Sequence, residues 1–315
     1  MKNFKKLVML CMVLVAGLFV TACGSNNQDN SADGQQGTQN TQEQAAAPAD
    51  GGSKDAPITV VSREDGSGTR GAFTEITGVL EKDANGNEND KTVASAAVQN
   101  STNGVMMTVG QDPNAIGYIS LGSLNDSVKA LKVEGVEATS EKIQSGDYKI
   151  SRPFNIAYKD GLNDVAKDFL VYIASKEAQD VISQEGYEQT AGDHPAYQKQ
   201  NDLSGKVRIS GSTSVTPLME KLTEAYKAIY PNVEFEIQSN GSSAGMTDTM
   251  GGAADLGMAS RELKDEEAKE LKSEVIAIDG IAVIVNKENA VEDLTMDQIK
   301  QIYTGEIANW SEVTK

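Results

Sequence analysis

Short apolar runs alternate along the chain with segments whose apolar residues recur at helical spacing. The short runs are rich in β-branched residues and are bounded by polar or glycine-containing stretches, which is typical of buried strands. They occupy residues 58–61, 115–120, 154–158, 207–210, 233–237 and 281–285. Helical spacing is found over residues 165–183, 218–229 and 296–302. The alternation predicts an α/β fold.

The first residues follow another pattern. Lys2, Lys5 and Lys6 precede an apolar run of only fourteen residues, 7–20. A helix of that length is too short to span about 30 Å of hydrocarbon, so residues 1–22 are predicted to be a signal peptide that is removed. Small residues precede Cys23, a pattern that resembles a bacterial lipobox, in which the cysteine becomes lipidated. The alternative is an ordinary signal peptide with an incidental Cys23.

The segment after Cys23 is polar. Residues 24–54 contain no Leu, Ile, Val or aromatic residue, so this segment cannot bury enough apolar surface to offset the entropy cost of ordering it. Residues 23–54 are therefore predicted to be a disordered tether that starts at the lipidated cysteine. No cysteine follows Cys23, which predicts a folded part with neither a disulfide nor a cysteine metal site.

Charge and the scarcity of histidine exclude several functions. The formal net charge of −18 argues against binding to nucleic acid or to an anionic membrane surface. The single histidine, His194, lies in a polar stretch, which disfavours a Ser-His-Asp triad or a histidine-rich metal site. None of the glycine-rich segments has the spacing of a nucleotide P-loop. We therefore expect a binding protein without a cofactor or metal, and not an enzyme.

Glycine, serine and threonine gather at three points between a predicted strand and a helical pattern, in residues 63–70, 211–217 and 240–246. Each segment predicts a helix N-terminus, where backbone N–H groups and hydroxyls together can hold an anion. For any one segment, simple helix capping is the alternative. Arg63 adds a planar donor fork suited to phosphate or carboxylate, and Asp65 is predicted to orient that fork; the alternative is a surface ion pair.

These motifs, taken together, identify a family resemblance. Residues 62–69, 209–217, 241–245, 255–262, 279–285 and 303–310 resemble the phosphate-binding component of the bacterial phosphate ABC transporter. The resemblance implies a type II-like periplasmic-binding-protein fold, in which two α/β lobes close on a ligand cleft. It also implies binding of inorganic phosphate outside the cell membrane and delivery to the permease and ATPase subunits of an importer. A monomer held at the membrane only by the lipid on Cys23 is expected.

The segment order differs from the usual family order, in which the part resembling 206–313 comes first. The chain therefore looks circularly permuted, and a truncated tandem protein is the alternative. By this analogy 55–122 is expected to form lobe II and 123–315 lobe I, with 184–204 as the connection joining the permuted halves. The segments near Pro57 and Asn309 are expected to lie close together.

The resemblance also implies a set of phosphate ligands from both lobes. They are Thr213, Ser214 and Ser242 on one lobe and Arg63, Ser67, Gly68 and Thr69 on the other.

One position departs from the family pattern. The carboxylate acceptor of well-known members aligns with Arg261, and an arginine cannot accept a hydrogen bond. Asp65 is the predicted substitute, Ser260 is a further candidate, and Arg261 is expected either to bind the anion or to point away. Two alternatives therefore remain: a receptor for another tetrahedral oxyanion such as sulfate, and a phosphate-sensing surface lipoprotein without a transport role.

Overall fold

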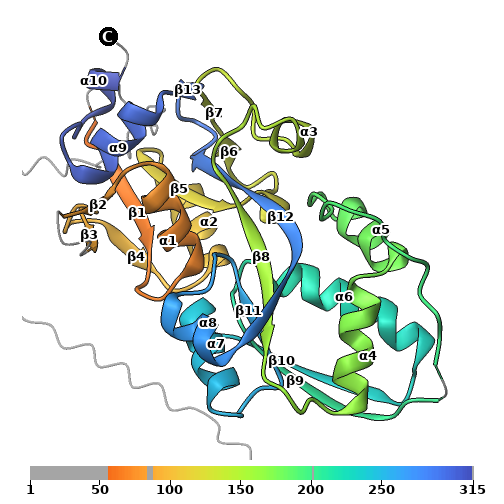
Figure 1. Cartoon of the computed structure of the whole chain (residues 1–315). Helices are drawn as coiled ribbons and strands as arrows, with labels where there is room; N and C mark the ends of the chain where they lie inside the picture. The colour runs from red at the N-terminus through yellow and green to blue at the C-terminus, as the bar shows by residue number, and fades with distance from the viewer. Residues whose placement is uncertain (1–55, 84–87, 201, 314–315) are drawn as a thin grey trace, which may run out of the picture. The chain divides into compact units, whose positions relative to one another are not determined.

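The computed structural model describes residues 56–83, 88–200 and 202–313 (Figure 1). The predicted signal peptide, Cys23 and the tether lie outside the described residues. Among the residues described, no helix is long and apolar enough to cross a membrane.

One sheet organises the described part of the chain. Its strands follow the order β10-β9-β11-β8-β12-β5-β1-β4, and β6 also pairs with β12. Their bounds are β1 Thr59–Arg63, β4 Ala97–Gln99, β5 Ala115–Ser120, β6 Lys129–Ala130, β8 Ser151–Tyr158, β9 Gly205–Gly211, β10 Val233–Ser239, β11 Leu256–Ala259 and β12 Lys272–Val285. Two small sheets pair β2 (Leu80–Lys82) with β3 (Glu88–Asp90) and β7 (Lys132–Val133) with β13 (Asp293–Leu294). All the strands predicted from the apolar runs are therefore confirmed.

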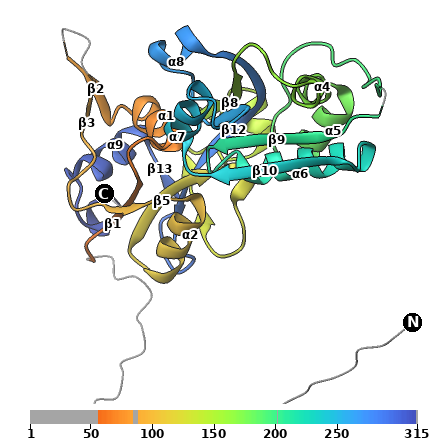
Figure 2. The ribbon, with the colours of Figure 1, turned by 90° about the horizontal axis from the view of Figure 1, so that it is seen from below.

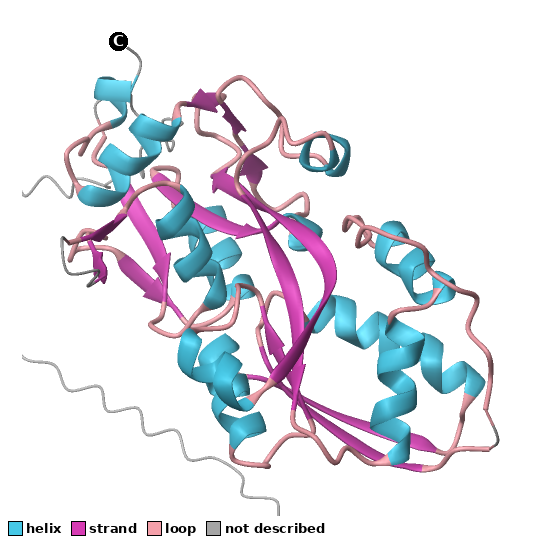
Figure 3. Cartoon of the chain, in the orientation of Figure 1, coloured by secondary structure: helices cyan, strands magenta, loops and turns pink. Residues whose placement is uncertain are grey.

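Helices pack on both faces of this sheet (Figure 3). Their bounds are α1 Gly68–Ile76, α2 Thr102–Gln111, α3 Ser140–Gln144, α4 Asp164–Ile173, α5 Lys176–Gln184, α6 Thr216–Ile229, α7 Ser242–Met250, α8 Asp265–Glu270, α9 Met296–Thr304 and α10 Trp310–Val313. The single helix expected over 165–183 is in fact α4 and α5. Ser175 separates them, because its side chain accepts a hydrogen bond from the N–H of Ala178 and starts a new helix there.

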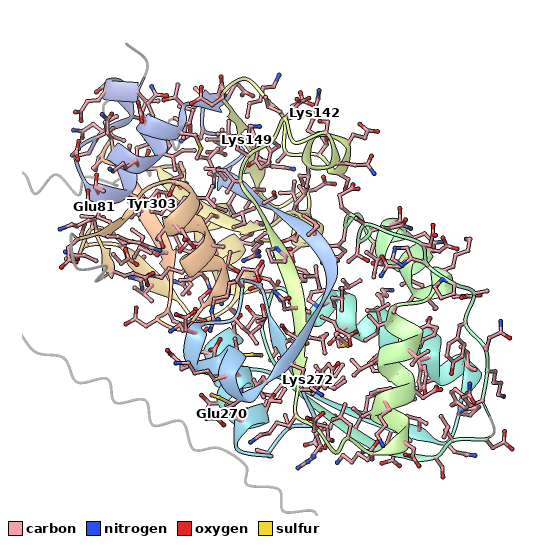
Figure 4. All side chains as sticks on the ribbon, viewed as in Figure 1. Glu81, Lys142, Lys149, Glu270, Lys272 and Tyr303 are labelled. Carbon is pink, nitrogen blue, oxygen red and sulfur yellow. The ribbon has the colours of Figure 1, made fainter. Side chains whose placement is uncertain are left out.

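Two long strands cross from one half of the sheet to the other. β8 and β12 pair antiparallel from Tyr158 opposite Lys272 to Ser151 opposite Gly280, and β12 then continues beside β5. Figure 4 shows the two ends of this crossing, with Lys149 just before β8 and Lys272 at the start of β12. We call β8 and β12 the crossing strands.

The buried apolar residues form separate cores on either side of the crossing strands. One side takes its core from residues 60–150 and 281–313, and the other from residues 154–277. We call residues 56–83, 88–150 and 281–313 lobe A, and residues 151–200 and 202–280 lobe B. In Figure 2, β9 and β10 of lobe B run side by side.

The expected boundary between the lobes at residue 122 is wrong. Residues 129–150 and 281–313 pack with the core of the first strands, because β12 turns from β8 to β5 at Gly280 and carries the chain back into lobe A. Lobe B is thus formed from one stretch of chain, and lobe A from two. Both crossing strands are continuous in sequence.

The segments near Pro57 and Asn309 lie close together, as expected. The N–H of Ile58 donates to the carbonyl of Ala308 at 2.8 Å, and Pro57 and Asn309 form an antiparallel bridge. In the usual family order the chain would run from the segment near Asn309 directly into the segment near Pro57, which requires the two segments to be close. The circular permutation itself stays a prediction.

The predicted connection 184–204 lies along the helices of lobe B. Tyr197 contacts the Tyr230 hydroxyl at 3.0 Å and also hydrogen-bonds Asp168 of α4, and the N–H of Gln200 donates to Tyr230 at 2.9 Å. This segment is therefore packed against α4 and α6 in a fixed path.

Candidate anion-binding site

The three glycine-, serine- and threonine-rich segments meet between the lobes. The first ends β1 and starts α1, where the Ser67 side chain caps the helix by accepting from the N–H of Arg70. The second joins β9 to α6, and the third precedes α7. Gly211 opens the second segment with a φ of 142°, and a β-carbon there would lie 2.2 Å from the carbonyl oxygen of Met258. Only glycine therefore allows this loop to approach β11 so closely.

Side-chain hydroxyls from both lobes contact one another at this point. We call this group the hydroxyl cluster; its members are Thr69 and Thr102 of lobe A and Ser212, Thr213, Ser214, Ser242 and Ser260 of lobe B.

Contacts between the lobes join Thr69 to Ser214 at 2.9 Å and Thr102 to Ser214 at 3.2 Å. Within lobe B, Ser260 contacts Ser212 at 2.9 Å and Ser242 at 3.4 Å. These six hydroxyl residues are buried.

The backbone of lobe A approaches the hydroxyls of lobe B closely at Gly68. A β-carbon on Gly68 would lie 2.4 Å from the Ser242 hydroxyl oxygen and 2.7 Å from that of Ser260. The first turn of α1 therefore reaches the lobe B hydroxyls only because residue 68 has no side chain. The N–H of Ser243 in turn donates to the carbonyl of Gly66 at 3.1 Å.

Arg63 is the charged member of the site. Its side chain is only 2% exposed, and its Nη2 donates to the Thr213 hydroxyl at 3.1 Å. Glu64 accepts from Nε and Nη2 of Arg63, both at 2.8 Å, and so fixes the plane of the guanidinium. The buried Tyr118 hydroxyl accepts from the Arg63 N–H at 3.2 Å and holds the end of β1.

The expectation that Asp65 orients Arg63 or serves as the buried acceptor is wrong. The Asp65 side chain is 98% exposed and accepts from Arg70 at 2.8 Å. Gly66 follows with a φ of 86°, so the chain turns after Asp65 and leaves its carboxylate on the surface. The neighbouring Glu64 takes the orienting position instead.

Arg261 lies beside the cluster and is held by a carboxylate. Its guanidinium donates to both oxygens of the buried Glu267, at 2.7 and 2.8 Å, and to the Ser243 hydroxyl at 3.1 Å. Burial alone would raise the pKa of Glu267, but hydrogen bonds from Arg261 and from the Lys264 N–H outweigh it and lower that pKa.

Two hollows flank the cluster. A cleft of about 550 Å³ is lined by Ser67 and Arg70 of lobe A, by Ser243 and Arg261 of lobe B, and by Arg152 of β8. A smaller hollow of about 180 Å³ is lined by two residues of the cluster, Thr102 and Thr213. Solvent therefore reaches the neighbourhood of the cluster from both hollows.

A second buried polar group lies in the crossing strands. Arg152 and Asp279 face each other in the register of β8 and β12 and form an ion pair at 3.0 Å, and Ser120 donates to Asp279 at 2.8 Å. Burial raises the pKa of Asp279 and lowers that of Arg152, because each charged form loses its water; the pairing partly offsets both shifts.

The structure brings together most of the residues implied by the resemblance. Arg63, Ser67, Gly68 and Thr69 come from lobe A, and Ser260 joins the lobe B residues. The lobe B members are Thr213, Ser214 and Ser242.

Sequence reasoning missed Thr102, Ser212 and Glu64. Thr102 follows the N-cap Ser101 and so looked like part of an ordinary helix start; its contacts with residues 213 and 214 depend on pairing far along the chain. In the described part of the chain, no group of His, Cys, Asp and Glu side chains is arranged to hold a metal ion.

Comparison with known proteins decides the family. The sequence is 46% identical to the phosphate-binding protein PstS 2 of Streptococcus agalactiae serotype V, over the full length of both chains. The chain therefore belongs to the PstS family of phosphate-binding proteins. Residues 14–177 and 191–315 also match the sequence family of the PBP superfamily domain.

Further PstS relatives support this assignment. Phosphate-binding protein PstS 2 of Streptococcus pneumoniae serotype 4 is 43% identical and is covered over 99% of its length. Among solved structures, a phosphate-binding protein of a phosphate ABC transporter from S. pneumoniae TIGR4 is 47% identical, with a TM-score of 0.65; the match covers 82% of this chain and 100% of the other. The match supports the two-lobe binding-protein fold, and the full-length alignment shows that the segment order is shared with the streptococcal PstS 2 proteins.

Proposed function

We propose that this chain binds inorganic phosphate at the hydroxyl cluster and delivers it to an ABC importer. The observation that carries the proposal is the meeting of hydroxyls from both lobes beside the buried Arg63, in a chain that belongs to the PstS family. A tetrahedral oxyanion needs donors around several oxygens, and two lobes that each supply donors satisfy this need only when they are closed on the ion.

The donors suit phosphate in number and kind. Arg63 supplies one positive charge close to the cluster, while Glu64 keeps its fork from rotating. The first turns of α1 and α7 add backbone N–H groups and the positive ends of their dipoles. We assign Arg63, Ser67, Gly68, Thr69, Thr213, Ser214, Ser242 and Ser260 to the phosphate site. Binding then requires no bond to be made or broken, and the chain acts as a receptor and not as an enzyme.

A sulfate receptor is the second candidate, and one observation favours it. The carboxylates of Glu64 and Glu267 each hold a site arginine with both oxygens, so neither is set aside for the proton that distinguishes phosphate from sulfate at neutral pH. Arg261 lines the cleft and donates to Ser243, and its charge is paired with that of Glu267.

The wider role follows from the family and from the ends of the chain. Lipidation of Cys23 would hold the receptor at the outer face of the cell membrane, and residues 24–54 would let lobes A and B reach the permease. The permease and ATPase subunits of a phosphate importer are the proposed partners of a monomeric receptor.

Calorimetric titration of the full chain, stripped of bound anion, tests this proposal. We expect one phosphate per chain and a much weaker response to sulfate. Arg63→Gln removes a charged donor and should weaken phosphate binding roughly 10- to 100-fold. Arg208→Gln is the matched control, because Arg208 pairs with Asp255 away from the cluster. Equal affinity for both anions would favour the sulfate candidate, and binding of neither would contradict both.

A further inference from the structure

The hydroxyl of Thr102 does not cap its own helix. The cap of α2 is Ser101, whose side chain accepts from the N–H of Gly104 at 3.1 Å. Thr102 is 4% exposed, and its hydroxyl lies 3.3 Å from that of Thr213 and 3.2 Å from that of Ser214. A lobe A side chain thus bridges two neighbouring hydroxyls of lobe B.

The guanidinium of Arg63 favours one direction for the hydrogen bonds through this bridge. A guanidinium can only donate, so the Thr213 oxygen accepts from Arg63 and leaves its own proton for Thr102. The Thr102 proton is then available to Ser214, and the Ser214 proton to Thr69 at 2.9 Å. In this order Thr213, Thr102 and Ser214 each accept one hydrogen bond and donate one, and each keeps a second lone pair.

That second lone pair matters for a ligand that carries a proton. Phosphate at neutral pH brings at least one P–O–H donor, whereas sulfate brings none. The nearby carboxylates are committed to arginines: Glu64 to Arg63, Glu267 to Arg261 and Asp279 to Arg152. A cluster hydroxyl that donates its own proton to a neighbouring hydroxyl can still accept a hydrogen bond from phosphate through its second lone pair.

We propose that Thr102 is a phosphate-binding and specificity-determining residue: it completes the one-way chain Arg63, Thr213, Thr102, Ser214, Thr69, and this chain accepts the proton of bound phosphate. The inference rests on the proposed phosphate function and assigns its selectivity to a hydroxyl in place of a carboxylate. An entering phosphate replaces only the contact between Ser214 and Thr69 with contacts of similar strength, so this exchange costs little, while the Thr213–Thr102–Ser214 contacts persist and supply the accepting lone pair.

The test compares three variants of the full chain by titration with phosphate and by competition with excess sulfate. Thr102→Val keeps the branched shape and removes the hydroxyl; it should weaken phosphate binding by about three- to tenfold while sulfate binding changes less, so the phosphate-over-sulfate ratio falls. Thr102→Ser restores a hydroxyl and should recover the ratio. Ser101→Ala is the control, because it removes the cap of the same helix; it should lower the urea midpoint and leave the ratio unchanged.

The outcomes separate the two proposals. Wild-type affinity for phosphate in Thr102→Val, or an equal loss for phosphate and sulfate, overturns the role of Thr102 while the phosphate function stands. The role of Thr102 is also overturned if Ser101→Ala lowers the phosphate-over-sulfate ratio as much as Thr102→Val does. The loss would then come from a disturbed α2 and not from the missing Thr102 hydroxyl. A wild-type chain that does not bind phosphate overturns the proposed function and the role of Thr102 together.

Discussion

The hydroxyl cluster and the Arg152–Asp279 pair are both buried polar groups, yet they are built from opposite kinds of side chain. In the cluster, neutral hydroxyls from the two lobes touch at 2.9 to 3.4 Å. In the crossing strands, two full charges face each other at 3.0 Å and Ser120 occupies a remaining oxygen of Asp279.

The difference fits the proposed closing of the two lobes on phosphate. Hydroxyls can exchange one another for water or an anion at little cost, so they suit the place where the lobes part. A buried charge that loses its partner is expensive, so a charge pair suits the place where the lobes stay joined. Charge is thus fixed in the crossing strands, and the interlobe contacts are carried mainly by neutral groups.

The largest effect is expected from breaking the charge pair. Asp279→Asn leaves the Arg152 guanidinium buried without its counter-charge and should lower the free energy of unfolding by about 3–5 kcal/mol, measured in urea. Asp65→Asn makes the same chemical change on an exposed pair and should cost about 0–1 kcal/mol. The double variant R152M/D279L removes both charges and should recover much of the loss. Similar free energies of unfolding for D279N and D65N would contradict the expectation that the buried ion pair contributes more to stability than the exposed one.

A side chain added between the lobes at residue 68 should weaken phosphate binding more than it lowers the free energy of unfolding. Gly68→Ala places a β-carbon against the Ser242 and Ser260 hydroxyls, and closure should then cost about 1–3 kcal/mol, or roughly 5- to 150-fold in phosphate affinity. Gly71→Ala is the matched control in the same helix, because its nearest neighbour, Cδ of Arg261, would lie 3.8 Å away. Titration of both variants checks this. Equal affinities would mean that the two lobes do not close on phosphate at Gly68.

The smallest effect should come from the ion pair at the cleft, and it should depend on pH. The pKa of Glu267 is lowered from its ordinary value of 4.5, so its pairing stabilises the folded chain above that pH and the contribution is lost as pH falls through the lowered value. Glu267→Gln should cost about 1–2 kcal/mol at pH 7, and the difference from wild type should shrink below pH 4.5. Glu266→Gln, on an exposed position of α8, is the control. A difference that is constant with pH would show that ion pairing is not its cause.

Periodicity predicted the elements of the fold well and their assembly less well. The apolar runs located strands such as β5 and β9, because a buried strand must be apolar. The first half of β12 was missed, since Lys272, Ser273 and Glu274 are polar and the strand is defined there by pairing with β8. The lobe boundary was misplaced for the same reason: Gly280, where β12 changes partner, carries no local signal.

The site shows the same limit. The glycine, serine and threonine motifs located the loops that meet, because their helix-starting pattern is local. Choosing between Glu64 and Asp65 required the turn at Gly66, and finding Thr102 required knowing that α2 lies against the loop before α6.

A crystal structure of the chain grown with phosphate would show where the ion binds. We expect one phosphate in contact with lobe A through Arg63 and Thr69 and with lobe B through Ser214 and Ser242, while the Arg152–Asp279 pair is unchanged. A phosphate held at the cleft by Arg70 and Arg261, with Thr69 and Ser214 still bonded to each other, would contradict this assignment.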